Sequence, residues 1–493
     1  MGKQQKVVLL YPRIHDDNRH HPWKLAPLPI MAVSAPLLAD GFDVTLIDGD
    51  VDPDWLRKVL TSCADALLLG ISAMSGTQIR YGLEAAKAVR AAGLKLPIVW
   101  GGYHASILPE QTSQNPFVDA VVRGQGELTL LEIVRKLSQG EDFTDVDGIT
   151  FTRDAETVST ADRKMEDINN FPRLAYEKLE RPEQYISKVP SLGTRTINYI
   201  SSQGCPFRCQ FCAEPLVYQR RWKAYTADRV LADLEFLQSF LDINGVTYHD
   251  PNFFVNERRA REIAEKKVER GVKPAWSACA RSSQVVKFSD ETYKALRASG
   301  LRSFFMGVES GSNEVLGGLQ KDICMEDSVE AARVATKNGI YVSCSFIVGF
   351  PGETETEMNE TWNMMEQISV IIGEFSSDLL FYAPVPGHSL YEKACEMGFE
   401  RPASLEEWAR FRTTDPKLPW MSEKLTNRMK QRHFYFTYGY PAEAVRRRSA
   451  GNLPLRAYFA IANRLSSARC RHQYWKNPLD WWILQGLKFL FKN

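Results

Sequence analysis

The chain has 493 residues, of which 44% are hydrophobic and 25% charged. These ordinary globular values exclude a disordered or collagen-like chain. At roughly 150 residues per domain, the length predicts about three domains. Lys and Arg (61) balance Asp and Glu (60), so the formal net charge is +1 and we expect no nucleic-acid partner held by bulk charge. No apolar run is long enough for a signal peptide or a membrane span, and we expect a cytoplasmic location.

Residues 1–150 alternate short apolar runs with amphipathic stretches. The predicted strands are 6–11, 43–47, 66–71, 97–100 and 118–122, and the predicted helices are 27–40, 55–62, 78–92 and 128–137. This alternation predicts an α/β domain with a doubly wound parallel sheet, whose ligand would sit at the carboxyl ends of the strands. Residues 151–195 show no long period and are predicted to be a linker.

Residues 196–400 contain six further strand–helix units. The predicted strands are 196–201, 246–249, 275–280, 303–308, 342–348 and 379–382, and the predicted helices are 226–241, 257–270, 290–299, 325–338, 354–371 and 389–397. Six parallel units predict a partial (β/α)6 TIM-like barrel with its active site in the loops after the strands. Residues 401–493 lack strand patterns and are predicted to form a helical, basic and aromatic region.

Three cysteines lie close together after the first strand of this second half. Cys205, Cys209 and Cys212 have the spacing C-x3-C-x2-C, with no fourth cysteine at a matching distance. Three thiolates at this spacing suit three corners of an iron–sulfur cube and leave one iron for an outside ligand. Structural zinc is the alternative, but such sites normally use four ligands, often in C-x2-C pairs.

This motif in a six-unit αβ barrel resembles the radical S-adenosylmethionine (SAM) superfamily. The resemblance implies that the cysteines bind a [4Fe-4S] cluster whose fourth iron is chelated by SAM. It also implies SAM contacts after the other strands, in segments similar to the family's G-x-E-S-G-S motif and its acidic and glycine-rich segments. The residues assigned to SAM on this basis are Phe211, Asp250, Arg281, Glu309, Ser310 and Gly349.

His388 departs from the family pattern. The sixth strand ends in Ala383-Pro-Val-Pro-Gly387-His388, where relatives often have a small hydroxyl residue at the last position. A histidine in the site is a candidate proton donor or acceptor, so we assign it a catalytic role. The alternative is an ordinary histidine at a helix N-terminus.

The first domain resembles the cobalamin-binding domain that precedes the barrel in class B radical SAM enzymes. The similar segments are G-I-S-x-M, G-G-x-H-x-S and R-G-x-G-E, except that Gln125 stands where relatives usually have Glu. The resemblance assigns these residues to cobalamin: Ser72, Met74, Ser75, Gln78, Gly101, Gly102, His104, Gly124, Gly126 and Glu127. Because D-x-H-x-x-G is absent, we expect cobalt to bind without histidine; only His104 is a candidate to overturn this.

The resemblance implies an enzyme that methylates an unactivated carbon through a 5′-deoxyadenosyl radical and methylcobalamin. It implies a small-molecule substrate and an external flavodoxin- or ferredoxin-like electron donor. The alternative enzyme is a cobalamin-dependent oxidative cyclase or rearrangement enzyme, as in tetrapyrrole ring closure. The non-enzyme alternative is a cobalamin carrier.

The near-zero net charge hides an asymmetry. Residues 446–493 contain ten Lys and Arg and one acid, Asp480, so this segment carries +9 and the rest of the chain carries −8. A basic aromatic helix suits the anionic cytoplasmic face of a membrane, and a lipid or tetrapyrrole substrate would fit such a location. The alternative is a helix that packs on the barrel with its arginines in solvent.

Overall fold

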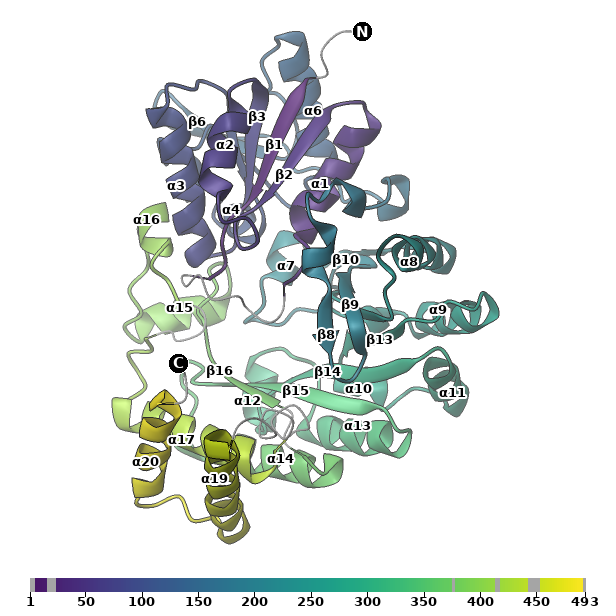
Figure 1. Ribbon diagram of the computed structural model, residues 1–493. Coiled ribbons are helices and arrows are strands. Elements are labelled where there is room, and N and C mark those ends of the chain that lie inside the picture. Colours follow the sequence, from purple (N-terminus) through teal and green to yellow (C-terminus); the bar gives the residue numbers. More distant parts are fainter. Residues whose placement is uncertain (1–4, 16–23, 375–376, 413–416, 442–452, 491–493) are drawn as a thin grey trace. The chain divides into compact units, whose positions relative to one another are not determined.

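The computed structural model describes residues 5–15, 24–374, 377–412, 417–441 and 453–490. It divides into two compact units (Figure 1). Unit 1 comprises Met1–Trp276, Ala383–Cys395 and Glu400–Pro416, and unit 2 comprises Ser277–Tyr382, Glu396–Phe399 and Lys417–Asn493. The domain boundaries expected near residues 150, 195 and 400 stay predictions.

A seven-stranded sheet opens unit 1, with the strand order β2-β1-β3-β4-β5-β6-β7. Its first five strands are parallel: β1 (Lys6–Tyr11), β2 (Asp43–Asp48), β3 (Ala66–Ser72), β4 (Ile98–Gly101) and β5 (Ala120–Val122). Helices α1 (Leu28–Ala39) and α6 (Glu127–Gln139) pack on one face, and α2 (Trp55–Cys63) and α3 (Thr77–Ala91) lie on the other (Figure 1). The predicted doubly wound sheet is confirmed. Two short helices after β4, α4 (Tyr103–Ile107) and α5 (Pro109–Ser113), were not predicted.

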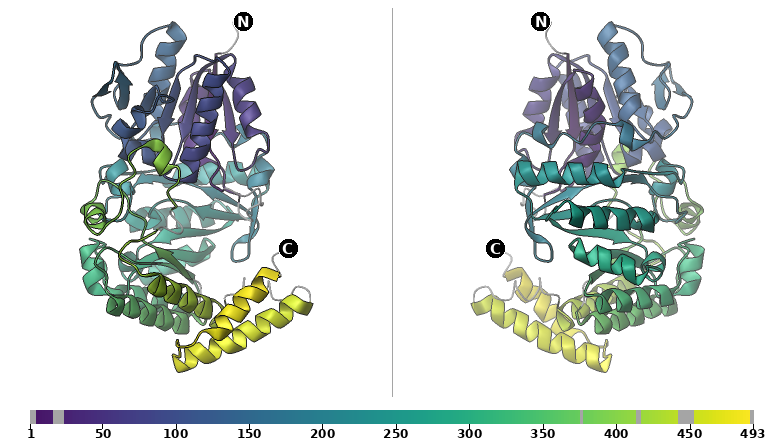
Figure 2. Two further views of the ribbon diagram at one scale, coloured as in Figure 1. Left: turned by 90° about the vertical axis from the view of Figure 1, so that its left-hand side faces the viewer. Right: turned by 90° about the vertical axis from the view of Figure 1, so that its right-hand side faces the viewer.

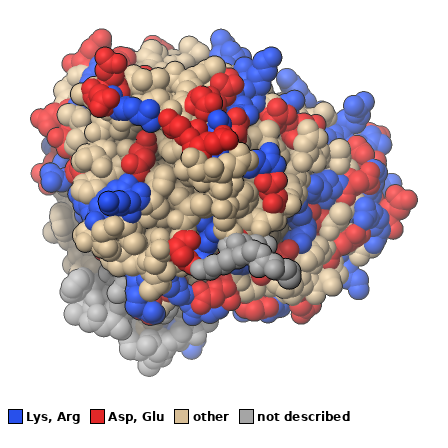
Figure 3. Space-filling view, turned by 90° about the horizontal axis from the view of Figure 1, so that it is seen from above, with Lys and Arg blue, Asp and Glu red and all other residues tan. Residues whose placement is uncertain are grey.

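The core of this domain lies between the sheet and α1 and α6. Val7, Leu9 and Val99 of the strands pack with Ile30 of α1 and Ile133 of α6, and all five are buried. Alternation of buried strands with one-sided helices therefore produces the layers that the apolar pattern predicts. On the face seen in Figure 3, acidic and basic side chains are interspersed.

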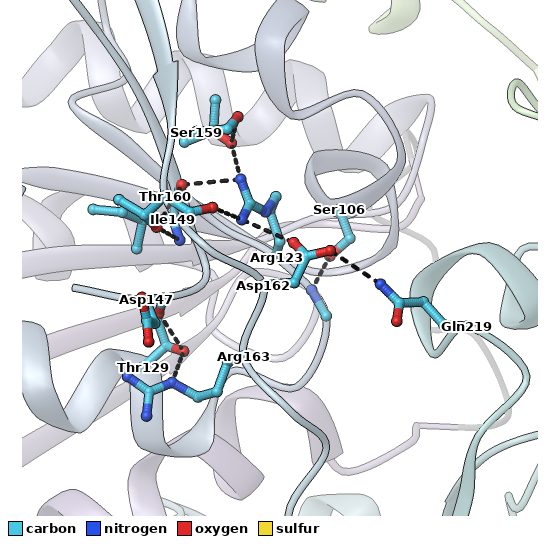
Figure 4. Close-up of polar contacts among 12 residues, drawn as sticks. Ser106, Arg123, Thr129, Asp147, Ile149, Ser159, Thr160, Asp162, Arg163 and Gln219 are labelled. Atoms are coloured by element: carbon cyan, nitrogen blue, oxygen red, sulfur yellow. Dashed lines mark hydrogen bonds and ion pairs between the residues drawn. The ribbon is translucent and has the colours of Figure 1, made fainter. Parts of the chain in front are cut away.

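A hairpin that the sequence did not reveal extends the sheet. Strands β6 (Ile149–Arg153) and β7 (Glu156–Ser159) join it in antiparallel orientation. Arg123, from the R-G-x-G-E segment, holds the hairpin (Figure 4): its guanidinium donates to the carbonyl oxygens of Ile149 and Thr160 and to Thr150 Oγ1. It also pairs with Asp162 at 2.9 Å. Arg123 is therefore a scaffold residue of the motif.

The second sheet has the strand order β16-β15-β14-β13-β12-β9-β8. Its strands are β8 (Ser187–Val189), β9 (Gly193–Tyr199), β12 (Gly245–Tyr248), β13 (Ala275–Ala280), β14 (Leu301–Glu309), β15 (Tyr341–Val348) and β16 (Ser377–Phe381). The pairs β9–β12, β14–β15 and β15–β16 are parallel, and only the short β8 is paired antiparallel among the pairings described.

A helix follows each of the six main strands at the predicted place. They are α8 (Ala227–Leu241), α9 (Glu257–Glu269), α11 (Asp290–Ala298), α13 (Met325–Lys337), α14 (Glu355–Ile372) and α15 (Ser389–Glu396). Short helices α10 (Ser282–Val285), α12 (Asn313–Gly318) and α16 (Leu405–Trp408) lie in the loops. This series confirms the predicted partial barrel of βα units.

The last part of unit 2 is helical, as predicted. Helices α17 (Glu423–Gly439), α19 (Leu453–His472) and α20 (Leu479–Leu490) pack on one another, and α19 and α20 are the yellow pair in Figure 2. None of the helices within the described ranges combines the length and the hydropathy needed to cross a bilayer.

Replacing Arg123 with Met is expected to destabilise the first domain. The change removes the guanidinium donor of the Thr160 carbonyl oxygen and one partner of Thr150 Oγ1, whereas the Ile149 carbonyl keeps the Thr160 amide as a donor. An unsatisfied group costs about 1–3 kcal/mol. Thermal and urea denaturation should show the loss. Arg135→Met, which breaks a surface pair with Asp40, is the matched control and should change stability by less than about 1 kcal/mol. Equal stability of the two variants would contradict this role.

Candidate functional site

The three cysteines lie on a loop that a small hairpin closes. Strand β10 (Ser202–Gly204) pairs antiparallel with β11 (Trp222–Ala224), and all three cysteines lie between them. Gly204, with φ of +75°, must be glycine because a Cβ there would lie 2.2 Å from the carbonyl oxygen of Arg221. The Cys212 amide donates to the Cys209 carbonyl at 3.2 Å, which forms a tight turn between these two residues.

The thiols are near one another but do not form a single-ion site. None of the nine cysteines, all within the described residues, forms a disulfide. Burial raises the pKa of the Cys212 thiol to about 12, and the nearby thiols of Cys209 and Cys205 add to this. Across the described ranges, no three His, Cys, Asp or Glu side chains are placed to hold one metal ion. A cube spreads its thiolates over separate irons, so three spaced cysteines fit a cluster better than zinc.

Asp250 supports the start of this loop, and its expected contact with SAM stays a prediction. Its fully buried carboxylate accepts hydrogen bonds from the Ser201 amide, Ser201 Oγ and Ser202 Oγ at 2.6–2.7 Å. Burial raises the pKa of Asp250, and the nearby Arg259 guanidinium opposes that rise. Arg259 itself donates to the Ser201 carbonyl. The carboxylate thus fixes the chain just before Cys205.

In unit 2, Glu309 ends β14 in a strained conformation. Its φ is +67°, which is uncommon for a residue with a side chain and is a feature often found at functional sites. The buried carboxylate receives a hydrogen bond from Lys321 Nζ at 2.6 Å. The neighbouring Ser310 hydroxyl lies 3.2 Å from Thr361 Oγ1. These residues are thus placed at a strand end by bonds within their own unit.

Gly349 follows β15 and is covered by a later segment of unit 2. A Cβ at this position would lie 2.4 Å from the sulfur of Met421 and 2.8 Å from Leu418. Glu353 accepts from the Gly349 amide, and Trp420 Nε1 donates to the Gly349 carbonyl at 3.0 Å. The glycine therefore allows close approach of residues 418–421. Of two other predicted SAM contacts, Arg281 after β13 is buried, and Phe211 in the cysteine loop is partly buried.

A cavity of about 200 Å³ in unit 1 opens at the carboxyl ends of the first sheet's strands. Its wall is mainly apolar and includes Leu9, Ile71 and Val99. Eight of the residues assigned to cobalamin line it: Ser72, Met74, Gln78, Gly101, Gly102, Gly124, Gly126 and Glu127. A mostly apolar concavity with a few polar groups is the usual form of a cofactor site.

Ser75 and His104 do not line this cavity. The two side chains bond to each other, with Ser75 Oγ 2.9 Å from His104 Nδ1, and the His104 ring packs edge-on against Trp408 of α16. Burial lowers the pKa of His104 to about 3. His104, on α4, is thus neutral and packs against Trp408, and its assignment to cobalamin stays a prediction.

The same cavity is lined by residues that flank the cysteines. Ile200 and Gln203 precede Cys205, and Val217 and Tyr218 follow Cys212. The strand ends of the first sheet and the cysteine loop therefore share one cavity within unit 1.

Polar contacts tie these two parts together. Gln125 donates to Gln203 Oε1 at 2.8 Å, and Gln203 donates to the buried carboxyl of Glu127 at 2.5 Å. Burial raises the pKa of Glu127. On the other side of the loop, Tyr103 donates to the buried carboxyl of Glu214. The cysteine loop is hence bonded to the strand ends at two points.

His388 reaches the cysteine loop from the segment after β16. Its Nε2 lies 2.7 Å from the carbonyl oxygen of Cys212, within unit 1. The side chain is buried, and burial lowers the pKa of the imidazole. The structure thus places the ring against a peptide carbonyl.

Family models match both halves of the chain. The radical SAM superfamily model matches residues 199–365, and the B12 binding domain model matches residues 22–134. The chain therefore contains a radical SAM domain and a B12-binding domain. The described geometry agrees, because the three-cysteine loop lies in the first region and most of the cavity wall in the second.

Relatives with assigned or proposed activities span most of this radical SAM chain. An uncharacterised methyltransferase of Pyrococcus horikoshii is 27% identical over 88% of this chain and 93% of its own. An anaerobic magnesium-protoporphyrin IX monomethyl ester cyclase of Rubrivivax gelatinosus is 24% identical over 79% of this chain and 70% of its own. A solved structure of the radical SAM methyltransferase TsrM from Kitasatospora setae, with cobalamin and a [4Fe-4S] cluster, has a TM-score of 0.67 at 18% identity over 84% of this chain and 87% of that one. This structural likeness shows the shared fold.

Sequence reasoning missed the share of the cavity wall that the radical SAM half supplies. Gln203 lies between the first strand and Cys205, and Tyr218 lies in the loop after α7 (Glu214–Val217). Neither belongs to a recognisable motif of the B12-binding domain. The one available signal in the sequence was that these polar and aromatic residues stand close to the cysteines.

His104 is expected to be dispensable for cobalt. In His104→Asn the amide keeps a polar atom near the Nδ1 position, so the bond to Ser75 can persist while any imidazole ligand is lost. We expect the same cobalamin affinity and the same cob(II)alamin EPR spectrum, without nitrogen splitting, as in the unaltered protein. Gly102→Val is the positive control, since its Cβ would lie 2.9 Å from the Ala73 backbone, and it should lose cobalamin. Nitrogen splitting that disappears in His104→Asn would contradict the expectation.

Proposed function

We propose that this chain is a cobalamin-dependent radical SAM enzyme that methylates an unactivated carbon of a small molecule. The observation that carries the proposal is the single cavity lined by the B12-binding strand ends and by residues on either side of the three cysteines. Methyl transfer to a carbon radical requires the two cofactors to face one substrate. The shared cavity provides such a meeting point in unit 1.

When bound, a reduced [4Fe-4S] cluster with SAM supplies a 5′-deoxyadenosyl radical, and methylcobalamin supplies the methyl group. Cys205, Cys209 and Cys212 would hold the cluster. The strand ends at Ser72, Gly102 and Gly124 would hold the corrin side, together with Gln203 and Tyr218 of the radical SAM half.

The chain's own residues prepare the site for this chemistry. The cavity wall is mainly apolar, and a substrate that fills it would displace water and protect a reactive radical from side reactions. Asp250, the Gln203–Glu127 contact and the Tyr103–Glu214 contact keep the cysteine loop in place without a cofactor. For SAM itself, the proposed contacts remain Phe211, Asp250, Arg281, Glu309, Ser310 and Gly349. The electron for the cluster must come from outside the chain, and we propose a flavodoxin- or ferredoxin-like donor.

The second candidate is a cobalamin-dependent oxidative cyclase. It is favoured by the relative from Rubrivivax gelatinosus, whereas the methyltransferase from Pyrococcus horikoshii has higher identity and covers more of this chain. A cobalamin carrier would not need the three-cysteine loop or the supports around it. We therefore place methylation first.

Anaerobic turnover with SAM, cobalamin and a low-potential reductant separates these functions. Methylation predicts one 5′-deoxyadenosine and one S-adenosylhomocysteine per product, and the product gains one methyl group. Formation of 5′-deoxyadenosine without S-adenosylhomocysteine, with a product that lacks two hydrogens, would contradict methylation and favour cyclisation. The substrate is sought in lipid and tetrapyrrole extracts.

Replacing Cys205, Cys209 and Cys212 together with Ala should abolish all SAM cleavage, because no iron–sulfur cluster can bind. Cobalamin binding should persist, since the cavity wall formed by the B12-binding domain remains. Cys279→Ala and Cys324→Ala, outside the loop, are the matched controls and should keep a full cluster. SAM cleavage by the triple variant would refute the assigned cluster site.

We also propose that the C-terminal helices contact an anionic membrane surface. Helix α19 buries Tyr458, Ala462, Ser466 and Cys470, at four-residue intervals, in the contact with its neighbours. Arg456 and Arg464, two residues before Tyr458 and Ser466, are exposed on the opposite face, and Ile461 and Leu465 are exposed on its flank. One face of the helix thus packs on the protein, and the rest of its surface presents apolar and basic side chains to solvent. Packing and membrane contact are therefore compatible in one helix.

Helix α20 likewise exposes apolar side chains, and basic side chains near it are exposed as well. It buries Trp481 and Leu484 but exposes Leu479, Trp482 and Ile483 by 59–73%. Arg464, Arg471 and Lys476 are also exposed. Exposed apolar groups that enter a headgroup layer, with basic neighbours worth about 1 kcal/mol each near an anionic surface, suit peripheral binding. The arginines at 446–448 lie outside the described residues.

A vesicle assay tests this surface. The triple variant Leu479→Ser, Trp482→Ser and Ile483→Ser should lose most co-sedimentation with vesicles of phosphatidylglycerol and phosphatidylcholine, and pure phosphatidylcholine should bind the unaltered protein weakly. Val370→Ser, which removes an equally exposed apolar side chain from α14, is the matched control and should bind like the unaltered protein. Equal vesicle binding by the triple variant and the control would remove the membrane proposal.

A further inference from the structure

Three consecutive residues after β16 contact the cysteine loop through hydrogen bonds and packing. His388 Nε2 lies 2.7 Å from the Cys212 carbonyl oxygen, and Ser389 Oγ donates to the side-chain oxygen of Gln210 at 2.9 Å. Gly387 has a φ of +95°, and a Cβ there would lie 3.1 Å from Leu216. Residues 387–389, which we call the clasp, therefore follow the loop from Gln210 to Leu216 closely. All of these residues belong to unit 1.

The histidine contact fixes the state of the ring. A carbonyl oxygen only accepts hydrogen bonds, so Nε2 must carry the proton and donate it. The ring is 7% exposed, and its Nε2 is already used by the peptide of the third cysteine. Any proton transfer would therefore have to use Nδ1 alone. The geometry favours a supporting role over proton transfer.

We propose that His388 is a positioning residue for the iron–sulfur cluster, acting through the carbonyl of Cys212. This inference rests on the proposed cluster but not on methylation. The Cys209–Cys212 turn and the His388 bond together hold the last cysteine's peptide from both sides. The donated hydrogen bond offsets the negative end of a carbonyl dipole beside the cluster. Hydrogen bonding and charge around a cluster set its reduction potential, so losing this bond should make reduction harder.

The clasp also explains why a histidine can stand where a small hydroxyl is common. The Gly387 turn lies on Leu216, and the imidazole spans from that turn to the Cys212 carbonyl. A serine or threonine at 388 is too short to place a donor where Nε2 lies. In this chain, position 388 therefore reaches the cluster loop directly.

Two variants of one residue separate positioning from proton transfer. In His388→Gln the amide nitrogen occupies a place close to Nε2 and can still donate to Cys212. In His388→Asn the amide ends near the Nδ1 position and falls short, so it is the matched control. Each protein is loaded with iron and sulfide anaerobically, and cobalamin binding serves as the test of folding for unit 1.

The measurements are iron content, the EPR spectrum of the reduced cluster with and without SAM, its midpoint potential, and reductive SAM cleavage without substrate. We expect His388→Gln to match the unaltered protein. His388→Asn should show an altered EPR spectrum, a more negative potential and SAM cleavage reduced by about tenfold to a hundredfold, as for other residues that orient metal ligands. Loss of iron in His388→Asn alone also supports positioning. Ser389→Ala, which removes the other clasp contact, should shift the EPR spectrum less.

Three results would overturn the proposal. If both His388 variants lose activity equally while their EPR spectra and potentials stay unchanged, the imidazole acts in proton transfer. If both behave like the unaltered protein in every measurement, the contact has no role at the cluster. If His388→Gln loses the cluster as His388→Asn does, the donated bond is not what matters. Failure of methylation leaves all of these readouts intact, so the two proposals are tested separately.

Discussion

The buried carboxylate of Asp250 fixes the point from which the whole candidate site is built. It accepts three hydrogen bonds from Ser201 and Ser202, while Arg259 binds the Ser201 carbonyl from the same region. A buried charge is tolerated only when it is paired and hydrogen-bonded, and breaking such a pair costs about 3–5 kcal/mol. This network fixes the chain just after β9. The position of Ser202 in turn sets where β10 and the cysteine loop begin.

The position of Ser202 sets the course of β10 in two respects. Gln203 turns toward the B12-binding domain and bonds Glu127 and Gln125, and two residues later the chain reaches Cys205. A single three-residue strand therefore sets both the cavity wall and the start of the cysteine loop. At the far end of the loop, Glu214 meets Tyr103, so the loop is bonded to the B12-binding domain at both ends. This gives a physical basis for coordinated chemistry at the two cofactors within unit 1.

The elements of the fold could be predicted because apolar periodicity reports burial directly. The parallel strands and their helices lie within a few residues of the expected places. The β6–β7 hairpin was missed because seven of its eleven residues are polar and because Arg123, outside the segment, holds it. Motifs likewise located the cysteine loop and the glycine-rich strand ends but not the direction of each side chain. His104 lies in the expected motif, yet the turn of α4 points its ring toward Trp408.

Sequence patterns also do not show whether a residue of a ligand-binding type bonds to a ligand or to the protein itself. A carboxylate after a strand and a glycine in a loop predict ligand contacts from the sequence, and the structure adds that Asp250 also binds serines and that Gly349 also adjoins Met421. Such residues shape a site by holding its backbone, and sequence patterns do not distinguish holding from contacting. The C-terminal region shows the reverse case. Composition alone left packing and membrane contact as alternatives, whereas four-residue spacing of Tyr458, Ala462 and Ser466 on the inner face of α19 lets one helix do both. Its outer face therefore stays available for a partner without any loss of the packing that holds the helix in place.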